Sequence, residues 1–220
     1  MRFFAYAIAM GATLAQLLPP AAVLPAWRRT SVARRWIAVW GIVFFFSDML
    51  QLSVSRFQHN NLFLFIFINP IEDGMILWAL SHWQTRPLIR IAYRVAIPIV
   101  ILIYIVIAIA AGEQSGFQSF AGPFRSLVVL AAALFTLLSR STEEAEGVWS
   151  KDWFWVTIGV SLYYGLIVAA EPVVALLVPH NVSAALAVFT VKAIGDIIAF
   201  ILIWRGMRCP LTQGSYSGST

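Results

Sequence analysis

The chain has 220 residues, of which 60% are hydrophobic and only 11% are charged, and its formal net charge is +5. Soluble domains carry roughly 25% charged residues, so a mean hydropathy of +0.83 excludes an ordinary soluble protein and predicts an integral membrane protein. A net positive charge can indicate nucleic-acid binding, but here the basic residues lie at the ends of apolar segments, where membrane topology explains them. We therefore expect the lipid bilayer as the main partner and no nucleic acid.

Seven apolar segments follow one another along the chain, with short connections between them. Most have about the length that a helix needs to cross a bilayer, roughly 20 residues. The sequence therefore predicts an all-α, polytopic bundle of seven transmembrane helices in residues 1–208, followed by a disordered cytoplasmic tail in residues 209–220. The segments are residues 3–26, 36–55, 61–83, 91–111, 124–138, 153–178 and 184–204.

The first segment has features of a secretory signal peptide, because the basic residue Arg2 precedes a long apolar run. However, Pro19, Pro20 and Pro25 interrupt the end of that run, and no small-residue cleavage site is evident. We therefore expect this segment to remain in the protein as its first transmembrane helix.

The basic residues also predict the orientation. If the connection after the first segment lies inside, the outer side carries only Arg2, Arg56 and Arg125. An excess of arginine and lysine on the cytoplasmic side is typical of membrane proteins, so the amino terminus is predicted outside and the carboxyl terminus inside. The inner connections then carry Arg28, Arg29, Arg34, Arg35, Arg86, Arg90, Arg94, Arg140, Lys151, Arg205 and Arg208.

The last apolar segment contains two charged residues, Lys192 and Asp196. A charge in hydrocarbon costs roughly 2.5–3.5 kcal/mol on insertion scales, so such residues normally face the bundle interior or a wet cavity and need partners. Because these two are four residues apart, they share one face of a helix and could pair with each other.

Three further carboxylates, Asp48, Glu72 and Glu171, lie inside other apolar segments. Counted from the outer end of each segment, they fall in the same layer as Lys192, in the outer half of the bilayer. Adjacent residues on a helix project about 100° apart, so we expect Glu72 and Asp73 to face different partners and Glu72 to face the core, and the position of Asp73 stays open.

Two of these segments also contain a proline, in Asn69-Pro70 and Glu171-Pro172. Proline removes a backbone donor and tends to kink a helix, which frees polar groups beside it. The candidate ligand- or proton-binding site therefore consists of Lys192, Glu72, Glu171, Asp196, Asp48 and Asn69.

Motifs typical of membrane enzymes are missing from the sequence. It contains no H-x-x-x-H pair for zinc, no G-x-S-x-G nucleophile motif and no phosphate-binding loop. The single cysteine, Cys209, allows no internal disulfide. We therefore expect no catalytic residues and no metal site, and the sequence identifies no cofactor.

Three functions fit the buried charges. The leading hypothesis is that the protein binds or senses a small ligand or a proton, without catalysis, because ionisable residues inside a membrane commonly mark functional sites. The alternative is a transporter or proton-translocating protein, including a retinal-binding one. A third hypothesis is an accessory subunit whose charges only hold helices, or a membrane-protein partner, in place.

A lysine in the last of seven helices and a carboxylate in the third, here Lys192 and Glu72, resemble the arrangement in rhodopsins. That resemblance implies retinal bound to the lysine as a protonated Schiff base, with a carboxylate counterion. The chain departs from the family at Val188, where microbial rhodopsins carry an aspartate, and it lacks the Asn-Pro-x-x-Tyr motif of animal receptors.

The chain also resembles short bacterial seven-helix membrane proteins of uncharacterised function. The resemblance is carried by Asn60-Asn61-Leu62 and Ile71-Glu72 in the third segment, and by a last segment in which Lys192 precedes an aromatic-rich end at Trp204. It implies a location in the bacterial inner membrane and carries over no activity.

Overall fold

The computed structural model describes residues 2–57, 63–113, 120–144 and 147–210, and no strand occurs among them. The predicted all-α architecture is therefore confirmed. The predicted tail and the Asn60-Asn61-Leu62 motif lie almost entirely outside the described residues. The elements are α1 (Arg2–Ala15), α2 (Leu18–Val23), the short 3-10 helix η1 (Leu24–Arg29), α3 (Val32–Phe57), α4 (Phe63–His82), α5 (Pro87–Ala110), α6 (Ala121–Glu143), the 3-10 helix η2 (Val148–Ser150), α7 (Asp152–Leu177) and α8 (Val182–Met207).

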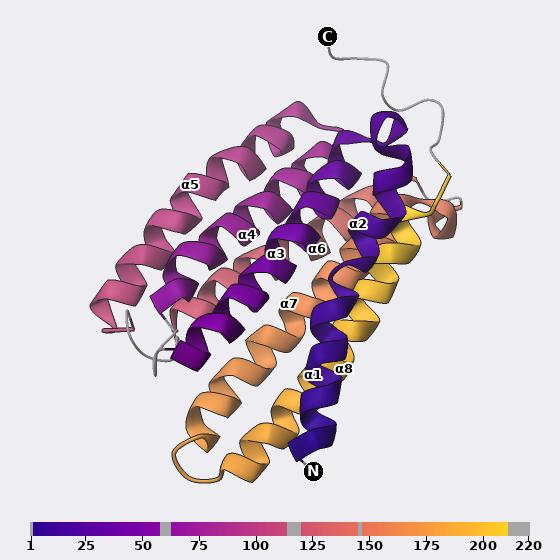
Figure 1. Ribbon diagram of the computed structural model, residues 1–220. Helices are drawn as coiled ribbons and strands as arrows, with labels where there is room; N and C mark the ends of the chain where they lie inside the picture. The colour runs from indigo at the N-terminus through magenta and orange to yellow at the C-terminus, as the bar shows by residue number, and fades with distance from the viewer. Residues whose placement is uncertain (1, 58–62, 114–119, 145–146, 211–220) are drawn as a thin grey trace.

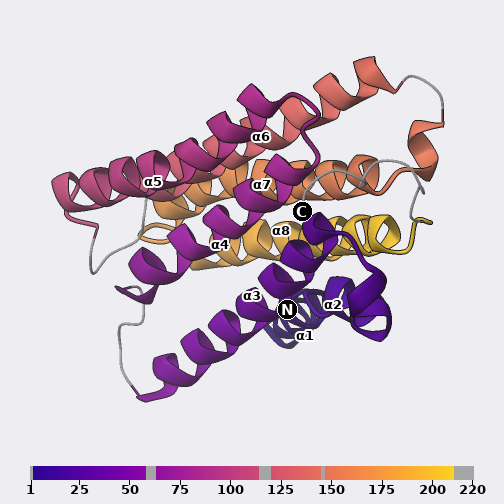
Figure 2. The ribbon, with the colours of Figure 1, turned by 90° about the horizontal axis from the view of Figure 1, so that it is seen from above.

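The long helices lie side by side in one bundle. α1 and α2 follow one another in the same direction, and from α3 on each long helix runs opposite to the one before it (Figure 1). We call the end of the bundle at which α1 begins the amino end, and the opposite end, at which α8 ends, the carboxyl end. Seen from above, α1 and α2 lie on one side of the bundle next to α3 and α8, and α5 and α6 lie on the opposite side (Figure 2).

Within the described residues, six helical segments are long and apolar enough to cross a membrane: Phe3–Arg29, Val32–Val54, Pro87–Ala110, Ala121–Glu143, Asp152–Leu177 and Val182–Met207. The 20-residue α4 lies among them and packs against α3, α5 and α6. Large apolar side chains such as Leu102 and Leu176 point outward and are 63% and 73% exposed. An apolar outer surface of this kind suits lipid rather than water, so the architecture is consistent with a helical membrane bundle.

Helices α7 and α8 pack closely because glycines remove the side chains between them. A Cβ atom added to Gly159 on α7 would lie 2.7 Å from the carbonyl oxygen of Ala199 on α8. A Cβ atom added to Gly206 on α8 would lie 2.9 Å from the carbonyl oxygen of Asp152. Small residues at helix contacts allow such backbone approach, which favours helix association in lipid.

The first apolar segment differs from the uninterrupted helix expected over residues 3–26. It breaks after α1, at Gln16 and Leu17, and restarts as α2 with prolines in its first turn. Proline is tolerated there because the first residues of a helix have no intrahelical partner for their N–H groups. Opposite the break, Gly41 on α3 leaves room for the chain, since a Cβ atom there would lie 2.7 Å from the carbonyl oxygen of Gln16.

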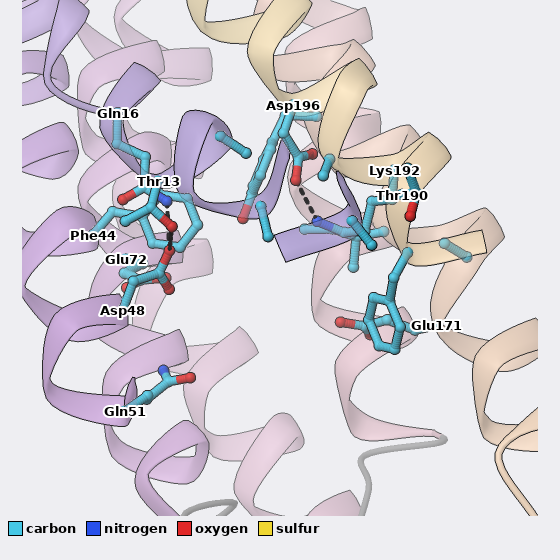
Figure 3. A pocket seen from close by; sticks show the side chains of 18 of the residues that line it. Thr13, Gln16, Phe44, Asp48, Gln51, Glu72, Glu171, Thr190, Lys192 and Asp196 are labelled. Carbon is cyan, nitrogen blue, oxygen red and sulfur yellow. Dashed lines mark hydrogen bonds and ion pairs between the residues drawn. The ribbon is translucent and has the colours of Figure 1, made fainter. Parts of the chain in front are cut away.

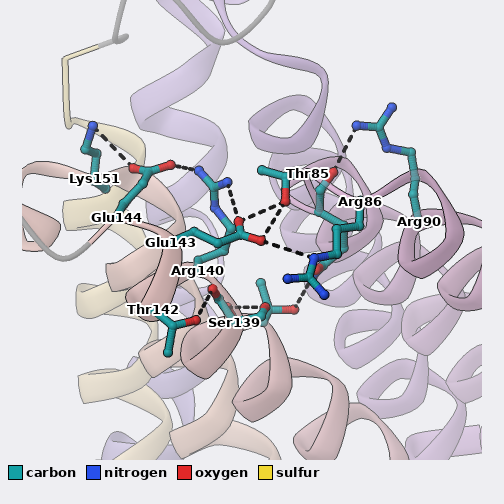
Figure 4. A network of polar contacts seen from close by, with 11 residues as sticks. Thr85, Arg86, Arg90, Ser139, Arg140, Thr142, Glu143, Glu144 and Lys151 are labelled. Carbon is teal, nitrogen blue, oxygen red and sulfur yellow. Dashed lines mark hydrogen bonds and ion pairs between the residues drawn. The ribbon is translucent and has the colours of Figure 1, made fainter.

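A polar network closes the carboxyl end of the bundle (Figure 4). Arg140 near the end of α6 pairs with Glu143 at 3.3 Å and also with Glu144, which in turn pairs with Lys151 at 3.4 Å. The hydroxyl of Thr85, from the connection between α4 and α5, donates to Glu143 at 2.8 Å. These contacts join the two connections, and α6 extends through this network beyond the expected segment of residues 124–138.

Candidate functional site

A cavity of about 790 Å³ lies in the amino-end half of the bundle, between α1, α3, α4, α7 and α8 (Figure 3). All six residues of the sequence-predicted site line it. Around them lie small side chains from α1 and an apolar and aromatic surface. The principal further lining residues are Ala5, Ala9, Ala12, Thr13, Gln16, Phe44, Gln51, Arg125, Tyr163, Ile167, Ala170, Phe189, Thr190 and Ala193.

Lys192 and Asp196 form an ion pair on the α8 side of the cavity. The Nζ atom of Lys192 donates to Oδ2 of Asp196 at 2.7 Å, and the two side chains are 17% and 13% exposed. The same Nζ atom lies 5.2 Å from the centre of the Tyr163 ring, within cation–π range. The pairing expected from the four-residue spacing is therefore present.

Asp48 accepts a hydrogen bond from a side chain at the break in the first segment, between α1 and α2. Its Oδ2 atom accepts a hydrogen bond of 2.6 Å from Nε2 of Gln16, and Oγ1 of Thr13 lies 3.5 Å away. Gln16 is only 4% exposed although it lies between two helices. Gln16 was not among the predicted site residues; its signal in the sequence is a glutamine three residues before a proline pair in an apolar segment.

Glu72 and Asp73 are adjacent on α4 and are both buried, but they contact different helices. Oε1 of Glu72 accepts a 2.7 Å hydrogen bond from Ser47 on α3. Asp73 accepts hydrogen bonds of 2.9 and 3.0 Å from Nη1 of Arg125 on α6, and its Oδ1 accepts another of 2.9 Å from the Tyr164 hydroxyl on α7. Glu72 faces the core as expected, and Asp73 links three helices.

Arg125 corrects the sequence analysis, which placed it among the charges at the outer surface. It is 6% exposed, lies in the first turns of α6 and lines the cavity while it pairs with Asp73. The pair spans 52 residues of sequence and depends on the packing of α4 against α6. Nothing within the segment of Arg125 itself indicates that partner.

Glu171 and Asn69 complete the predicted set. Glu171 lies on α7 directly before Pro172, through which the helix continues to Leu177. Its Oε2 atom is buried and has no hydrogen-bond partner among the described residues. Asn69 on α4 is 5% exposed and lines the same cavity. The structure thus brings Glu171 to the cavity without joining it to either ion pair.

Aromatic rings close the cavity toward the carboxyl end. Trp40 stacks on Phe44 at 5.6 Å and on Phe200 at 5.4 Å between ring centres, and Tyr163 meets Phe44 edge to face at 5.5 Å. Trp40 and Phe200 are fully buried. They lie one to two helical turns beyond Asp48 and Asp196, so they form a floor beneath the charged residues.

Comparison of the chain with protein-family models, with curated proteins and with solved structures yields no match. Among the described residues, no three histidine, cysteine, aspartate or glutamate side chains are grouped so that they could hold a metal ion. The arrangement offers instead a mostly apolar chamber with separated carboxylates.

Proposed function

We propose that the protein is an integral membrane protein that binds a small ligand, or takes up a proton, in the cavity between α1, α3, α4, α7 and α8. The observation that carries this proposal is a chamber of about 790 Å³ lined by Asp48, Glu72, Glu171 and Asp196 together with Lys192. Ligand sites commonly have this size and combine apolar walls with a few placed polar groups. The proposed role requires no catalysis.

Another ion pair in the same bundle joins helices without bordering either described cavity. At the carboxyl end, Nε of Arg34 pairs with Asp152 at 2.8 Å, and Arg34 also donates to the carbonyl of Met207. That pair lines neither of the two described cavities. The charges around Lys192, by contrast, surround open space, which a network serving only to hold helices together does not need.

The proposed topology has seven crossings, with α4 as the third, the amino end outside and the carboxyl end inside. The basic residues of the described chain gather at the carboxyl end, where Arg28, Arg29, Arg86, Arg205 and Arg208 lie at or beyond helix ends. This distribution supports the cytoplasmic assignment of that end. The cavity then lies in the outer half of the bilayer, and the resemblance to short bacterial proteins supports a bacterial inner membrane.

The second candidate is a transporter or proton-translocating protein. It is favoured by the break between α1 and α2, because discontinuous helices commonly form the substrate sites of secondary transporters. In this conformation the aromatic floor closes the carboxyl-end side, so transport requires a second conformation. Proton flux in liposomes that disappears in Glu72→Gln would favour this candidate over binding alone.

The test of ligand binding is thermal unfolding of the purified protein after dialysis, with and without a low-molecular-weight extract of the cells that produce it. The extract should raise the unfolding temperature of the wild type, because a ligand that binds only the folded state stabilises it. It should have no effect on Ala193→Phe, which fills part of the cavity. The matched control is Ala131→Phe on the exposed face of α6, which should respond like the wild type. An equal response in all three proteins would contradict binding in the cavity.

A further inference from the structure

The charges around the cavity do not balance within the described residues. Lys192 is paired with Asp196, and Arg125 is paired with Asp73. From the described residues, Asp48 and Glu72 receive hydrogen bonds only from the neutral side chains Gln16, Thr13 and Ser47. Three carboxylates, Asp48, Glu72 and Glu171, therefore have no cationic partner within ion-pair distance in the part of the chain that the structure describes.

The hydrogen-bonding groups show the same imbalance. Buried oxygen atoms on Gln16, Glu171 and Asp196 have no hydrogen-bond partner among the described residues. Among the described nitrogen atoms that line the cavity, only Nε of Arg125 is buried without a hydrogen-bond partner. Gln16 is 4% exposed, and its Nε2 must face Asp48 because a carboxylate can only accept, so its unpartnered atom is the amide oxygen. The lining therefore lacks donors rather than acceptors.

The three carboxylates without a cationic partner lie on two walls of the cavity. Asp48 and Glu72 belong to neighbouring helices, α3 and α4, and Glu171 belongs to α7, on the other side of the cavity in Figure 3. The described carboxylates form no group that could hold a single metal ion. The walls also carry apolar surface, from Phe44 on α3 and from Ile167 on α7. An elongated cation with an apolar middle can therefore pair with both walls at once.

We infer that the ligand of this cavity is a linear aliphatic cation with at least two ammonium groups, one bound at Asp48 and Glu72 and another at Glu171. This inference rests on the proposed function and specifies its ligand class. Each ammonium group supplies three donors and no acceptor, which matches the missing donors. Its methylene chain suits the aromatic and aliphatic surface of the two walls, and its charge offsets that of carboxylates placed in a membrane.

The test is calorimetric titration of the purified protein at neutral pH with 1,4-diaminobutane. The matched probes are n-butylamine, which has the same carbon chain and one charge, and 1,4-butanediol, which has none. We expect the diamine to bind at least about tenfold more tightly than the monoamine, equivalent to roughly 1.4 kcal/mol, and the diol not to bind. Glu171→Gln should reduce diamine affinity to that of the monoamine and leave monoamine binding unchanged.

Glu143→Gln is the matched control, because Glu143 lies in the polar network at the carboxyl end and should alter neither affinity. If Glu171→Gln does not fold, Glu72→Gln makes the same comparison from the other wall. In that variant the diamine should bind no more tightly than the monoamine. Equal affinity of the wild type for diamine and monoamine, or no binding of either, would overturn the inference.

The outcomes separate the ligand class from the proposed function. If neither amine binds but the cell extract stabilises the wild type and not Ala193→Phe, the cavity binds a ligand of another class. If the diamine binds the wild type and Ala193→Phe with equal affinity, its site lies outside the cavity and the inference is wrong. If neither the amines nor the extract has any effect, the proposed function fails as well.

Discussion

Nε2 of Gln16 lies 2.6 Å from Oδ2 of Asp48, so the break in the first apolar segment is bonded directly to a carboxylate of the cavity. The break places the polar side chain of Gln16, which lies between α1 and α2, against α3. Asp48 thereby acquires a donor within the membrane-spanning bundle. The helix break that precedes Pro19 and Pro20 thus supplies a hydrogen bond to a carboxylate that lines the cavity.

Gly41→Ala should destabilise the protein by disturbing this break. The added Cβ atom would lie 2.7 Å from the carbonyl oxygen of Gln16 and 3.1 Å from Cδ of Pro20, and neither is a flexible side-chain end. Overpacking of this kind typically costs about 1–3 kcal/mol, whereas alanine gains only about 1 kcal/mol over glycine inside a helix. Denaturation of the purified protein in detergent measures the change.

Gly11→Ala is the control for that substitution. The nearest atom to its added Cβ would be Cδ1 of Ile197 at 3.6 Å, which is an ordinary contact. Its stability should equal or slightly exceed that of the wild type. If the two variants were equally stable, the close approach of α3 to the break would not hold the first segment in place.

Asp73→Asn should be among the most destabilising single substitutions near the cavity. It leaves the Arg125 guanidinium buried without a counterion, and loss of one partner of a buried pair costs about 3–5 kcal/mol. Tyr164→Phe removes one hydrogen bond to the same carboxylate, which costs about 1.5–3 kcal/mol. In detergent, Asp73→Asn should therefore unfold at a lower temperature than Tyr164→Phe. The reverse order of unfolding temperatures would contradict the role of this pair.

Lys192 and Asp196 should be energetically coupled. Lys192→Met leaves a carboxylate unpaired beside the cavity, and Asp196→Asn leaves the ammonium unpaired, so the double variant should recover part of the loss caused by either. A double-mutant cycle should give a coupling energy of about 0.5–3 kcal/mol. A cycle between Lys192→Met and Glu143→Gln at the far end of the bundle serves as the additive control. Additivity within about 0.5 kcal/mol for Lys192 and Asp196 would show that their contact does not contribute to stability.

Cys209 provides a test of the orientation, because it follows α8 at the carboxyl end. A membrane-impermeant maleimide should label it in inverted vesicles and not in intact spheroplasts. Burial raises the pKa of this thiol, so the reactive thiolate is scarcer at neutral pH, and labelling should keep accelerating as the pH rises above the usual thiol range. His180→Cys in a Cys209→Ser background, at the exposed connection between α7 and α8, should show the opposite sidedness. Labelling of Cys209 in intact spheroplasts would reverse the proposed topology.

The sequence predicts the cavity residues well because each charge stands out in an apolar segment. Lys192 and Asp196 could be paired from their spacing alone, since residues four apart share a helix face. Counting residues from the outer end of each segment predicts that Asp48, Glu72 and Glu171 lie in one layer, and the structure places all three around the same cavity.

What the sequence could not predict depends on contacts between distant segments. The Asp73–Arg125 pair spans 52 residues and the Gln16–Asp48 bond spans 32, and no local pattern encodes either. A hydropathy pattern also treats the first segment as continuous, because the break at Gln16 and Leu17 and the prolines after it leave the segment apolar enough for a single span. The partner of Arg125 therefore emerges only from packing, whereas the glutamine and the proline pair at the break are visible in the sequence.

Native mass spectrometry of the gently purified protein tests most directly whether the cavity holds a small ligand. The account predicts that the wild type and Ala131→Phe carry a bound small molecule that dissociates on activation, and that Ala193→Phe carries none, because its new ring occupies the cavity. The same bound mass retained by Ala193→Phe at the wild-type level, or no bound molecule in any of the three proteins, would contradict a ligand-binding cavity.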